Sequence, residues 1–409
     1  MTQKNEWEKR RLHSAKGLKQ LNEDYYAEAR SAHEQGKHVA WITAVFPVEL
    51  LCAMDIIPMY PENHAVICAA RHMTEELSEE VEAQGYSRDL CAYARCDLGS
   101  LQAGKSPIGG VPEPDFLLAC NTQCGTLSKW FEVLNRRFGA PVFLLDSPFI
   151  LSAEREPGAI RYFEDQLWEL IHLLEHNTGK KLKMDRLEEA LHYADRGCRL
   201  WNELLDMAAN KPSPLTYFDE SFLMAPIVNL RGRKKSVEFY EAVRDELAHW
   251  VKEGYSAIPD ERFRIYWEEK PFWFALREMS QFFMERRTAI LCSLYTHAWS
   301  YRFELSDPIS TLAKNYAMVY PNLNFNLRAD LMLEYMRRYH LHGLIAHGNR
   351  SCKGGVFGMV DIKEIIARKG GYPGVVIDAD MSDSRFFSRE QVYTRIDAFL
   401  ESLAMRYGI

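Results

Sequence analysis

Three short segments of the chain combine cysteine with turn-forming residues: 89–99 around Cys91, 120–126 around Cys124 and 348–355 around Cys352. The first also contains Arg95, and the third contains Arg350 and Lys353. Soft thiolates bind zinc and iron–sulfur clusters well. Helix N-termini and nearby cations favour the thiolate form. The spacing lacks the close Cys-x-x-Cys pairs of zinc ribbons and bacterial ferredoxins. The pattern alone therefore allows either a metal or cluster site or a set of buried core thiols.

The other six of the nine cysteines give weaker signals. An odd number cannot pair completely, and a reducing compartment does not favour disulfides. Cys52, Cys68 and Cys198 lie in helical patterns and are predicted to be structural, and Cys292 lies in an apolar strand and is predicted to be core. Cys96 and Cys120 share segments with better candidates and stay open as ligands.

Alternating strands and helices must position these segments. Apolar runs bounded by turns predict strands at 38–43, 55–60, 114–120, 141–145, 263–266, 288–294, 343–347 and 374–377. Helices are predicted at 6–36, 47–54, 72–84, 126–138 and 391–405, and 160–253 is mostly helical with a break at Pro212–Pro214. This alternation predicts parallel sheets, in which ligands lie beyond the carboxyl ends of the strands. Cys124 and Cys352 both follow such an end.

We predict an α/β protein with two doubly wound, mainly parallel-sheet (Rossmann-like) domains. The boundaries expected are an N-terminal helical segment at 1–36, a first α/β domain at 37–160, a helical connection at 161–260 and a second α/β domain at 261–409. The two α/β parts are candidates for two copies of one architecture. A length of 409 residues favours more than one core.

Composition narrows the function classes. The hydrophobic content of 47% and charged content of 26% are those of a globular protein. A net charge of -7 argues against a general nucleic-acid or membrane-surface binder. A polar N-terminus and the lack of an apolar run of spanning length predict a cytoplasmic protein.

The chain resembles the family of (R)-2-hydroxyacyl-CoA dehydratases and ATP-dependent benzoyl-CoA reductases over nearly its whole length, and most closely the alpha-type subunit of the dehydratases. The resemblance rests on seven segments together: 60–64, 89–95, 124–131, 295–299, 349–353, 378–385 and 394–399.

The resemblance implies a 4Fe-4S cluster held by Cys91, Cys124 and Cys352, with one iron lacking a protein ligand. It implies a related second cluster-bearing subunit in a heterodimer, an acyl-CoA substrate and a separate ATP-hydrolysing iron–sulfur activator. This chain has no Walker-type loop, so ATP hydrolysis is expected in that activator. The implied reaction removes water through a ketyl radical and forms a 2-enoyl-CoA.

The resemblance also assigns provisional roles. Glu62 is the candidate base or proton shuttle, or else it pairs with a cation in an exposed turn, and His64 either relays protons or caps that turn. Two further pairs remain open: His297 and Trp299 line the acyl pocket or form an aromatic core, and Arg350 and Lys353 hold cluster or CoA charge or pair at the surface.

One position departs from the family pattern. Where some dehydratases place a hydroxyl near the cluster, this chain has Ala44. Thr43 is adjacent, but neighbouring strand residues point to opposite faces. A hydroxyl contact to the cluster is therefore not expected here.

Three other functions stay in view beside the dehydratase. The first is a benzoyl-CoA reductase subunit, which would use the same cluster to reduce an aromatic ring. The second is a homodimeric cluster-bearing reductase of small molecules, with Cys96, Cys120 and Cys292 as additional ligands of a larger cluster. The third is a scaffold without metal.

Overall fold

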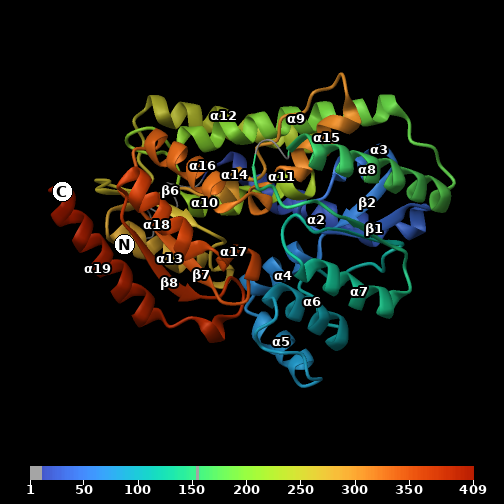
Figure 1. The fold of residues 1–409 in the computed structure, drawn as a ribbon, viewed down its shortest axis with the longest axis horizontal. Helices are drawn as coiled ribbons and strands as arrows, with labels where there is room; N and C mark the ends of the chain where they lie inside the picture. Colours follow the sequence, from blue (N-terminus) through green and yellow to red (C-terminus); the bar gives the residue numbers. More distant parts are fainter. Residues whose placement is uncertain (1–11, 153–155) are drawn as a thin grey trace.

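The computed structural model describes residues 12–152 and 156–409, and it contains two four-stranded parallel sheets. In Figure 1 the strands of the second sheet lie in the left half of the molecule and those of the first in the right half, with α9 (Met184–Met207) and α12 (Lys234–Lys252) along the top. Residues 6–11 of the expected first helix lie outside the described residues.

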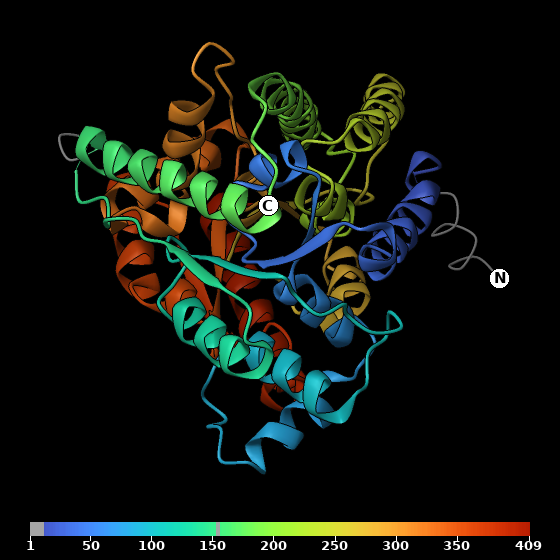
Figure 2. The same ribbon diagram turned by 90° about the vertical axis from the view of Figure 1, so that its right-hand side faces the viewer.

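The first sheet has the strand order β2-β1-β3-β4. Its strands are β1 (His38–Ile42), β2 (Ile56–Met59), β3 (Phe116–Cys120) and β4 (Val142–Leu145). All residues of the central strand β3 are buried, as expected for a parallel strand with helices on both faces, and the edge strand β2 is also fully buried. Figure 2 looks onto this half, where α7 (Thr126–Phe138) and α8 (Glu156–Thr178) lie on opposite sides of the β3–β4 edge.

The second sheet repeats this order as β6-β5-β7-β8. Its strands are β5 (Phe263–Glu268), β6 (Thr288–Cys292), β7 (Gly343–Asn349) and β8 (Gly374–Ala379). The two sheets are thus two copies of one topology, and the predicted α/β, doubly wound fold is confirmed. In each copy the strand order reverses between the first and third strands, which is where doubly wound sheets bind ligands.

The remaining helices cover the sheets and connect them. In the first half they are α2 (Gly17–Arg30), α3 (Val48–Ala53), α4 (Pro61–Ala70), α5 (Thr74–Glu82) and α6 (Ala92–Ala103). The connection also contains α10 (Tyr217–Leu223) and α11 (Ala225–Asn229). The second half adds α13 (Leu276–Glu285), α14 (Leu294–His297), α15 (Pro308–Ala317), α16 (Phe325–Arg338), α17 (Lys353–Val356), α18 (Met359–Gly370) and α19 (Arg389–Tyr407).

Two local expectations need correction. The strand expected at 288–294 ends at Cys292, because Ser293 caps the short helix α14 by accepting the Tyr295 N–H. The first helix ends at Arg30 rather than at Gly36, and a separate 3-10 turn at His33–Gln35 precedes the left-handed Gly36. Neither difference changes which strands carry the candidate cysteines.

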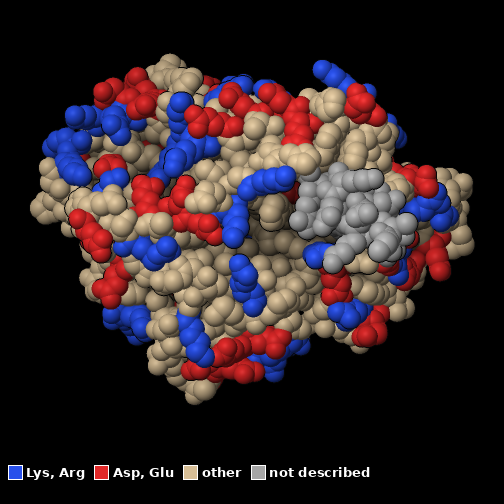
Figure 3. Space-filling view, turned by 180° about the vertical axis from the view of Figure 1, so that it is seen from behind, with Lys and Arg blue, Asp and Glu red and all other residues tan. Residues whose placement is uncertain are grey.

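The surface carries charges of both signs. On the face shown in Figure 3, Lys and Arg are interspersed with Asp and Glu, and no broad basic area covers the described residues there. None of the helices in the described residues combines the length and apolar character required to cross a membrane.

Candidate functional site

Each of the three candidate cysteines lies at the start of a helix. Cys91 is the N-cap of α6, Cys352 is the N-cap of α17, and Cys124 immediately precedes Gly125, the N-cap of α7. The first backbone N–H groups of a helix have no partner within it and favour negative charge. The N–H groups of Ala94 and Tyr93 accordingly act on the Cys91 thiol.

Contacts between neighbours of the cysteines bring the three loops together. Next to Cys352, the Ser351 Oγ accepts the N–H of Ala92, the residue after Cys91, at 3.1 Å. On the other side of Cys352, a Cβ on Gly354 would lie 2.7 Å from the Gln123 carbonyl oxygen and 3.0 Å from Cys124 Cβ. The Cys352 loop, from the second half of the chain, therefore touches the Cys91 and Cys124 loops, which both come from the first half.

The three thiols also influence one another electrostatically. Burial raises the pKa of Cys91 to about 12, and the charge of Cys124 adds to this rise. Burial is also the main cause of the raised pKa of Cys352, which Lys270 opposes and Glu269, Cys124 and Cys91 increase. Buried thiols that disfavour each other's ionisation are suited to a cationic group that would bind them as thiolates.

The thiols are not arranged for a single ion. Among the described residues, no group of three or more His, Cys, Asp or Glu side chains stands close enough to hold one metal ion. A tetrahedral ion with metal–sulfur bonds of about 2.3 Å needs its sulfurs within about 4 Å of one another. A multi-iron cluster spreads its cysteine ligands over several irons and does not require them to lie that close together.

Glu62 lies in the first turn of α4 and faces the end of β1. Its carboxylate accepts the N–H of Ala44 and, at 3.3 Å, the side-chain amide of Gln123. The same Gln123 accepts the N–H of Val45 at 3.1 Å. Burial raises the pKa of Glu62, and the Ala44 N–H and the Lys270 charge only partly oppose this rise. Glu62 is thus a buried carboxyl group and not part of an exposed turn.

The hydroxyl of Thr43, next to Ala44, has partners other than Glu62. Thr43 Oγ1 donates to the Val45 carbonyl at 3.2 Å and accepts the Cys120 N–H at 3.1 Å. It therefore links the ends of β1 and β3, while the backbone N–H of Ala44 donates to the Glu62 carboxylate.

Sequence reasoning missed Lys270, which lies beyond the end of β5. Its ammonium lies 3.6 Å from Cys352 Sγ and 3.2 Å from the Glu269 carboxylate. The signal that could have found it is its position: it follows the first strand of the second sheet, at the point where the strand order reverses. Gln123 and Glu269, which also follow strand ends, were missed as well.

The conspicuous segment 378–385 holds the cysteine loops in place. Asp380 accepts the Ser351 N–H at 3.2 Å. Asp383 accepts from Arg95 of α6 at 3.0 Å and from Arg385 at 2.7 Å. Arg95 also pairs with Glu82 of α5. This cluster, which we call the α6 clamp (Glu82, Arg95, Asp383 and Arg385), fixes the helix that begins at Cys91.

His64 is not brought to the cysteines of the three loops. Its Nδ1 lies 3.6 Å from the Asp97 carboxylate, and its Nε2 lies 3.0 Å from Ser106 Oγ and 3.7 Å from Cys68 Sγ. Burial opposes protonation of His64, but Asp97 and Cys68 outweigh burial and raise its pKa to about 9. His64 thus ties α4 to α6 and does not cap a turn.

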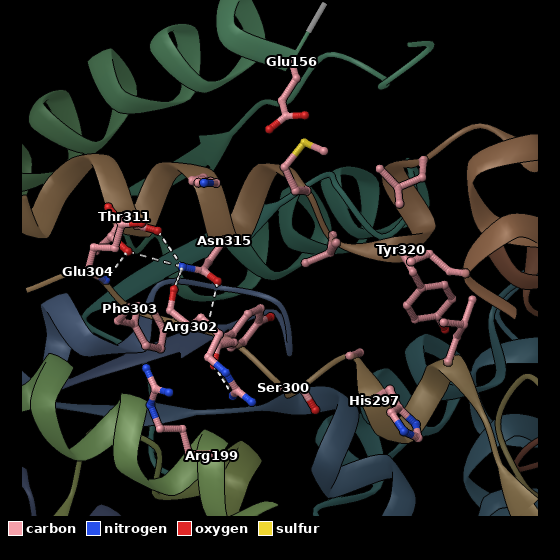
Figure 4. A pocket seen from close by; sticks show the side chains of 18 of the residues that line it. Glu156, Arg199, His297, Ser300, Arg302, Phe303, Glu304, Thr311, Asn315 and Tyr320 are labelled. Atoms are coloured by element: carbon pink, nitrogen blue, oxygen red, sulfur yellow. Dashed lines mark hydrogen bonds between the residues drawn. The ribbon is translucent and has the colours of Figure 1, made fainter. Parts of the chain in front are cut away.

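A cavity of about 670 Å³ opens beside α14 and α15. His297 and Tyr320 lie at one end of it, and Arg199 and Arg302 lie toward the other (Figure 4). Burial is the main cause of the raised pKa of Tyr320, and the charges of Glu269 and Lys270 also act on it. Tyr320, in the cavity wall, therefore experiences the charges of the residues beside Cys352.

His297 is held in the wall of this cavity. Its Nδ1 lies 2.9 Å from the Ser293 carbonyl and its Nε2 lies 3.2 Å from the Tyr339 hydroxyl. Burial lowers the pKa of His297 to about 4. At neutral pH it therefore presents a neutral imidazole.

Three other candidates lie elsewhere. Trp299 is buried against the Arg231 guanidinium, 5.5 Å from its ring centroid, and is not among the residues that line the cavity. Arg350 is exposed and lies 3.6 Å from Asp89, and Lys353 is exposed at the start of α17. Of the open residues, His297 alone lines the cavity.

The remaining cysteines are distributed through the core. Cys198 and Cys292 are buried, and Cys52 is half-buried with its thiol 3.6 Å from the Arg231 carbonyl. The thiol of Cys120 lies 3.2 Å from Thr122 Oγ1. Cys68 and Cys96 form a separate pair, in which the hydrogen bond from Cys96 and the contact with His64 lower the pKa of Cys68 to about 6.

Comparisons with known proteins show the family of this chain. The model of the family described as "2-hydroxyglutaryl-CoA dehydratase, D-component" matches residues 43–403. The chain is 33% identical to the (R)-2-hydroxyisocaproyl-CoA dehydratase alpha subunit of Clostridioides difficile, over 95% of this chain and 96% of that protein. It is 31% identical to the lactoyl-CoA dehydratase alpha subunit of Anaerotignum propionicum, over 92% and 93%.

A ring reductase is also similar. One of the benzoyl-CoA reductase subunits of Thauera aromatica is 28% identical, over 86% of this chain and 85% of that protein. The family model covers all three candidate cysteines, Glu62 and Lys270. The chain therefore belongs to the 2-hydroxyglutaryl-CoA dehydratase D-component family, and the resemblance inferred from its motifs is confirmed.

Proposed function

We propose that this chain is a subunit of an oxygen-sensitive (R)-2-hydroxyacyl-CoA dehydratase that binds a 4Fe-4S cluster through Cys91, Cys124 and Cys352. The observation that carries the proposal is the meeting of the three cysteine loops through the Ser351 and Gly354 contacts. The buried carboxyl group of Glu62 contacts Gln123 of the Cys124 loop, and the charges of Glu269 and Lys270 act on Tyr320 in the cavity wall. The dehydratase alpha subunits among the relatives support the reaction class.

Side chains alone cannot remove the β-proton of the substrate. The β-proton of an ordinary acyl-CoA is far too weakly acidic for a carboxylate base, and a ketyl radical of the thioester overcomes this. We propose that one electron enters from a separate ATP-hydrolysing iron–sulfur activator and is returned when the 2-enoyl-CoA forms. When bound, the cluster supplies Lewis acidity at an iron without a protein ligand.

Glu62 is the residue proposed to take the β-proton. Its carboxylate is held by the Ala44 N–H and the Gln123 amide, so its position is defined before substrate binds. Its raised pKa makes it a stronger base than an exposed glutamate. His64, which is bound to Asp97, is not assigned a proton-transfer step.

The cavity is the proposed acyl-CoA site. Arg302 and Lys314 line it and supply cationic groups of the kind that bind phosphates, so they are the proposed contacts for CoA. The neutral imidazole of His297 lies at the Tyr320 end of the cavity (Figure 4), where the charges of Glu269 and Lys270 act on Tyr320. The acyl end would therefore point toward Glu62 and Lys270.

The partners are proposed from the family. The similar dehydratase proteins are named as alpha subunits, and a related second cluster-bearing subunit is expected here in a heterodimer. We propose a cytoplasmic location, where low potential and the activator are available.

A second function is favoured by the 28% identical benzoyl-CoA reductase protein. In that case the same site would pass electrons into an aromatic ring and consume two electrons per turnover. The dehydratase would instead release water with no net reduction.

The test is anaerobic purification followed by assays with the second subunit, activator and ATP. We expect about four irons and four sulfides per chain, and turnover of a 2-hydroxyacyl-CoA without net electron consumption. Reduction of benzoyl-CoA would favour the second function. A protein that contains no iron, or one inert toward every acyl-CoA tested, would refute the proposal.

The ligand assignment has its own test. Cys91→Ala, Cys124→Ala and Cys352→Ala should each lose the cluster, because each removes one of the thiolates. Cys198→Ala and Cys52→Ala should keep it. A full iron content in Cys352→Ala would reject the assignment.

A further inference from the structure

Lys270 places a positive charge in the interior, next to a candidate cluster ligand. Its side chain is 15% exposed, and its Nζ donates to Cys352 Sγ at 3.6 Å. The same ammonium lies 5.5 Å from the centroid of the Tyr295 ring. Buried lysines are rare unless they are paired, and the partners of Lys270 are the Glu269 carboxylate and the Cys352 thiol.

The backbone at this point is strained and firmly held. Glu269, the residue before Lys270, has a φ of +80°, which non-glycine residues rarely adopt. His347 donates from Nδ1 to the Lys270 carbonyl at 2.7 Å. A Cβ on Gly355 would collide with the Glu269 carboxylate, so glycine is required there for this pair to fit. Such strain persists only where the surroundings enforce it, and it is common at functional sites.

Lys270 supplies the positive charge that acts on the Cys352 thiol. Cys352 faces Lys270, Glu269 and the two other thiols. Cys124 faces Glu62 and Lys270. The nearby Arg328 is already bound to Glu268 at 2.9 Å. With three thiolates, Glu62 and Glu269 around it, Lys270 is the main counter-charge of this site.

We propose that Lys270 sets the reduction potential of the cluster by donating a hydrogen bond to the Cys352 sulfur. Adding an electron makes a cluster more negative, so a cation beside a ligating sulfur favours the reduced form. Lys270 is a positioning residue, since it acts through Cys352. The inference rests on the proposed cluster and adds the residue that tunes it.

The experiment compares anaerobically reconstituted wild-type protein with Lys270→Met and Lys353→Met. Redox titration monitored by electron paramagnetic resonance gives the midpoint potential, and iron analysis gives the cluster content. Lys270→Met should lower the reduction equilibrium constant about tenfold, which is about 59 mV for one electron. Lys353→Met removes an exposed lysine beside the same cysteine and should leave the potential unchanged.

Glu269→Gln provides a variant of opposite sign. It removes a negative charge from the pair and should raise the potential. This variant keeps the proposal testable if Lys270→Met, which leaves Glu269 unpaired, loses its iron. A full iron content with an unchanged potential in Lys270→Met and Glu269→Gln would overturn the role of Lys270 and leave the proposed function standing. Wild-type protein without iron would overturn both.

Discussion

The contact between Gly354 and the Cys124 loop gives a direct test of how the two halves of the chain form one site. In Gly354→Ala the new Cβ would lie 2.7 Å from the Gln123 carbonyl oxygen and 3.0 Å from Cys124 Cβ. Ordinary contacts begin at 3.4 Å. The oxygen must therefore move by about 0.7 Å and Cys124 by about 0.4 Å, and overpacking of this kind costs about 1–3 kcal/mol.

Thermal unfolding of the metal-free protein measures this cost. The unfolding entropy of a chain of 409 residues, at about 2.1 cal/mol/K per residue, converts 1–3 kcal/mol into a fall in Tm of about 1–4 °C. Cluster content after anaerobic reconstitution should also fall, because Cys124 is displaced from Cys352.

Gly125→Ala is the matched control. Gly125 is the N-cap of α7 beside the same cysteine, has a φ of -69°, and has no atom within 4 Å of the position of an added Cβ. This variant should stay within about 0.5 kcal/mol of the wild type and keep its iron. If both alanine variants have the same Tm and the same iron content, the loops do not meet as described.

Two further predictions concern the α6 clamp and the base. Arg95→Met should lower the free energy of unfolding by about 1.5–3 kcal/mol, because the buried Asp383 loses one of its two arginine partners and keeps Arg385. Arg88→Met, at an exposed position, should change it by less than about 0.5 kcal/mol in denaturant titrations, and equal effects would contradict the clamp. Burial alone would raise the pKa of Asp383, but Arg385 and Arg95 outweigh it and lower the pKa, so the Arg95 contribution should be full above the ordinary aspartate pKa and be lost as the pH falls through the lowered value. Glu62→Gln should reduce kcat by about 10²–10⁴-fold with unchanged iron content, and an unaffected kcat would remove Glu62 from the mechanism. In the wild type the acid limb of the pH–rate profile should lie above the usual glutamate range, because burial raises the pKa of Glu62 and the base must be ionised.

The sequence by itself predicts the elements that depend on local patterns. Apolar runs such as Phe116–Cys120 mark buried strands, and the strand–helix alternation predicts two doubly wound sheets of one topology. Several helices of the second half, such as α13 and α16, do not follow from the pattern. The seven motif segments, among them those around Cys91, Cys124 and Cys352, identify the family because they are specific in combination, and the family model confirms it.

The location of individual candidates could not be derived in the same way. Glu62 and His64 are two residues apart on α4, yet one faces the end of β1 and the other faces Asp97 of α6. Trp299 was a pocket candidate but packs on Arg231, whereas His297 lines the cavity. A side chain's direction depends on which elements pack around its helix, and that information is absent from a local pattern.

Only the tertiary structure decided how the site is assembled. Ser351 and Ala92 are 259 residues apart and form one hydrogen bond, and Lys270 meets Cys352 across 82 residues. The segment 378–385 holds α6 through Arg95. Contacts of this kind arise from packing two sheets with their ligand-binding ends toward each other. Local propensity selects strands and helices within short windows, whereas the relative placement of two folded halves depends on the burial and charge pairing of residues far apart in the chain.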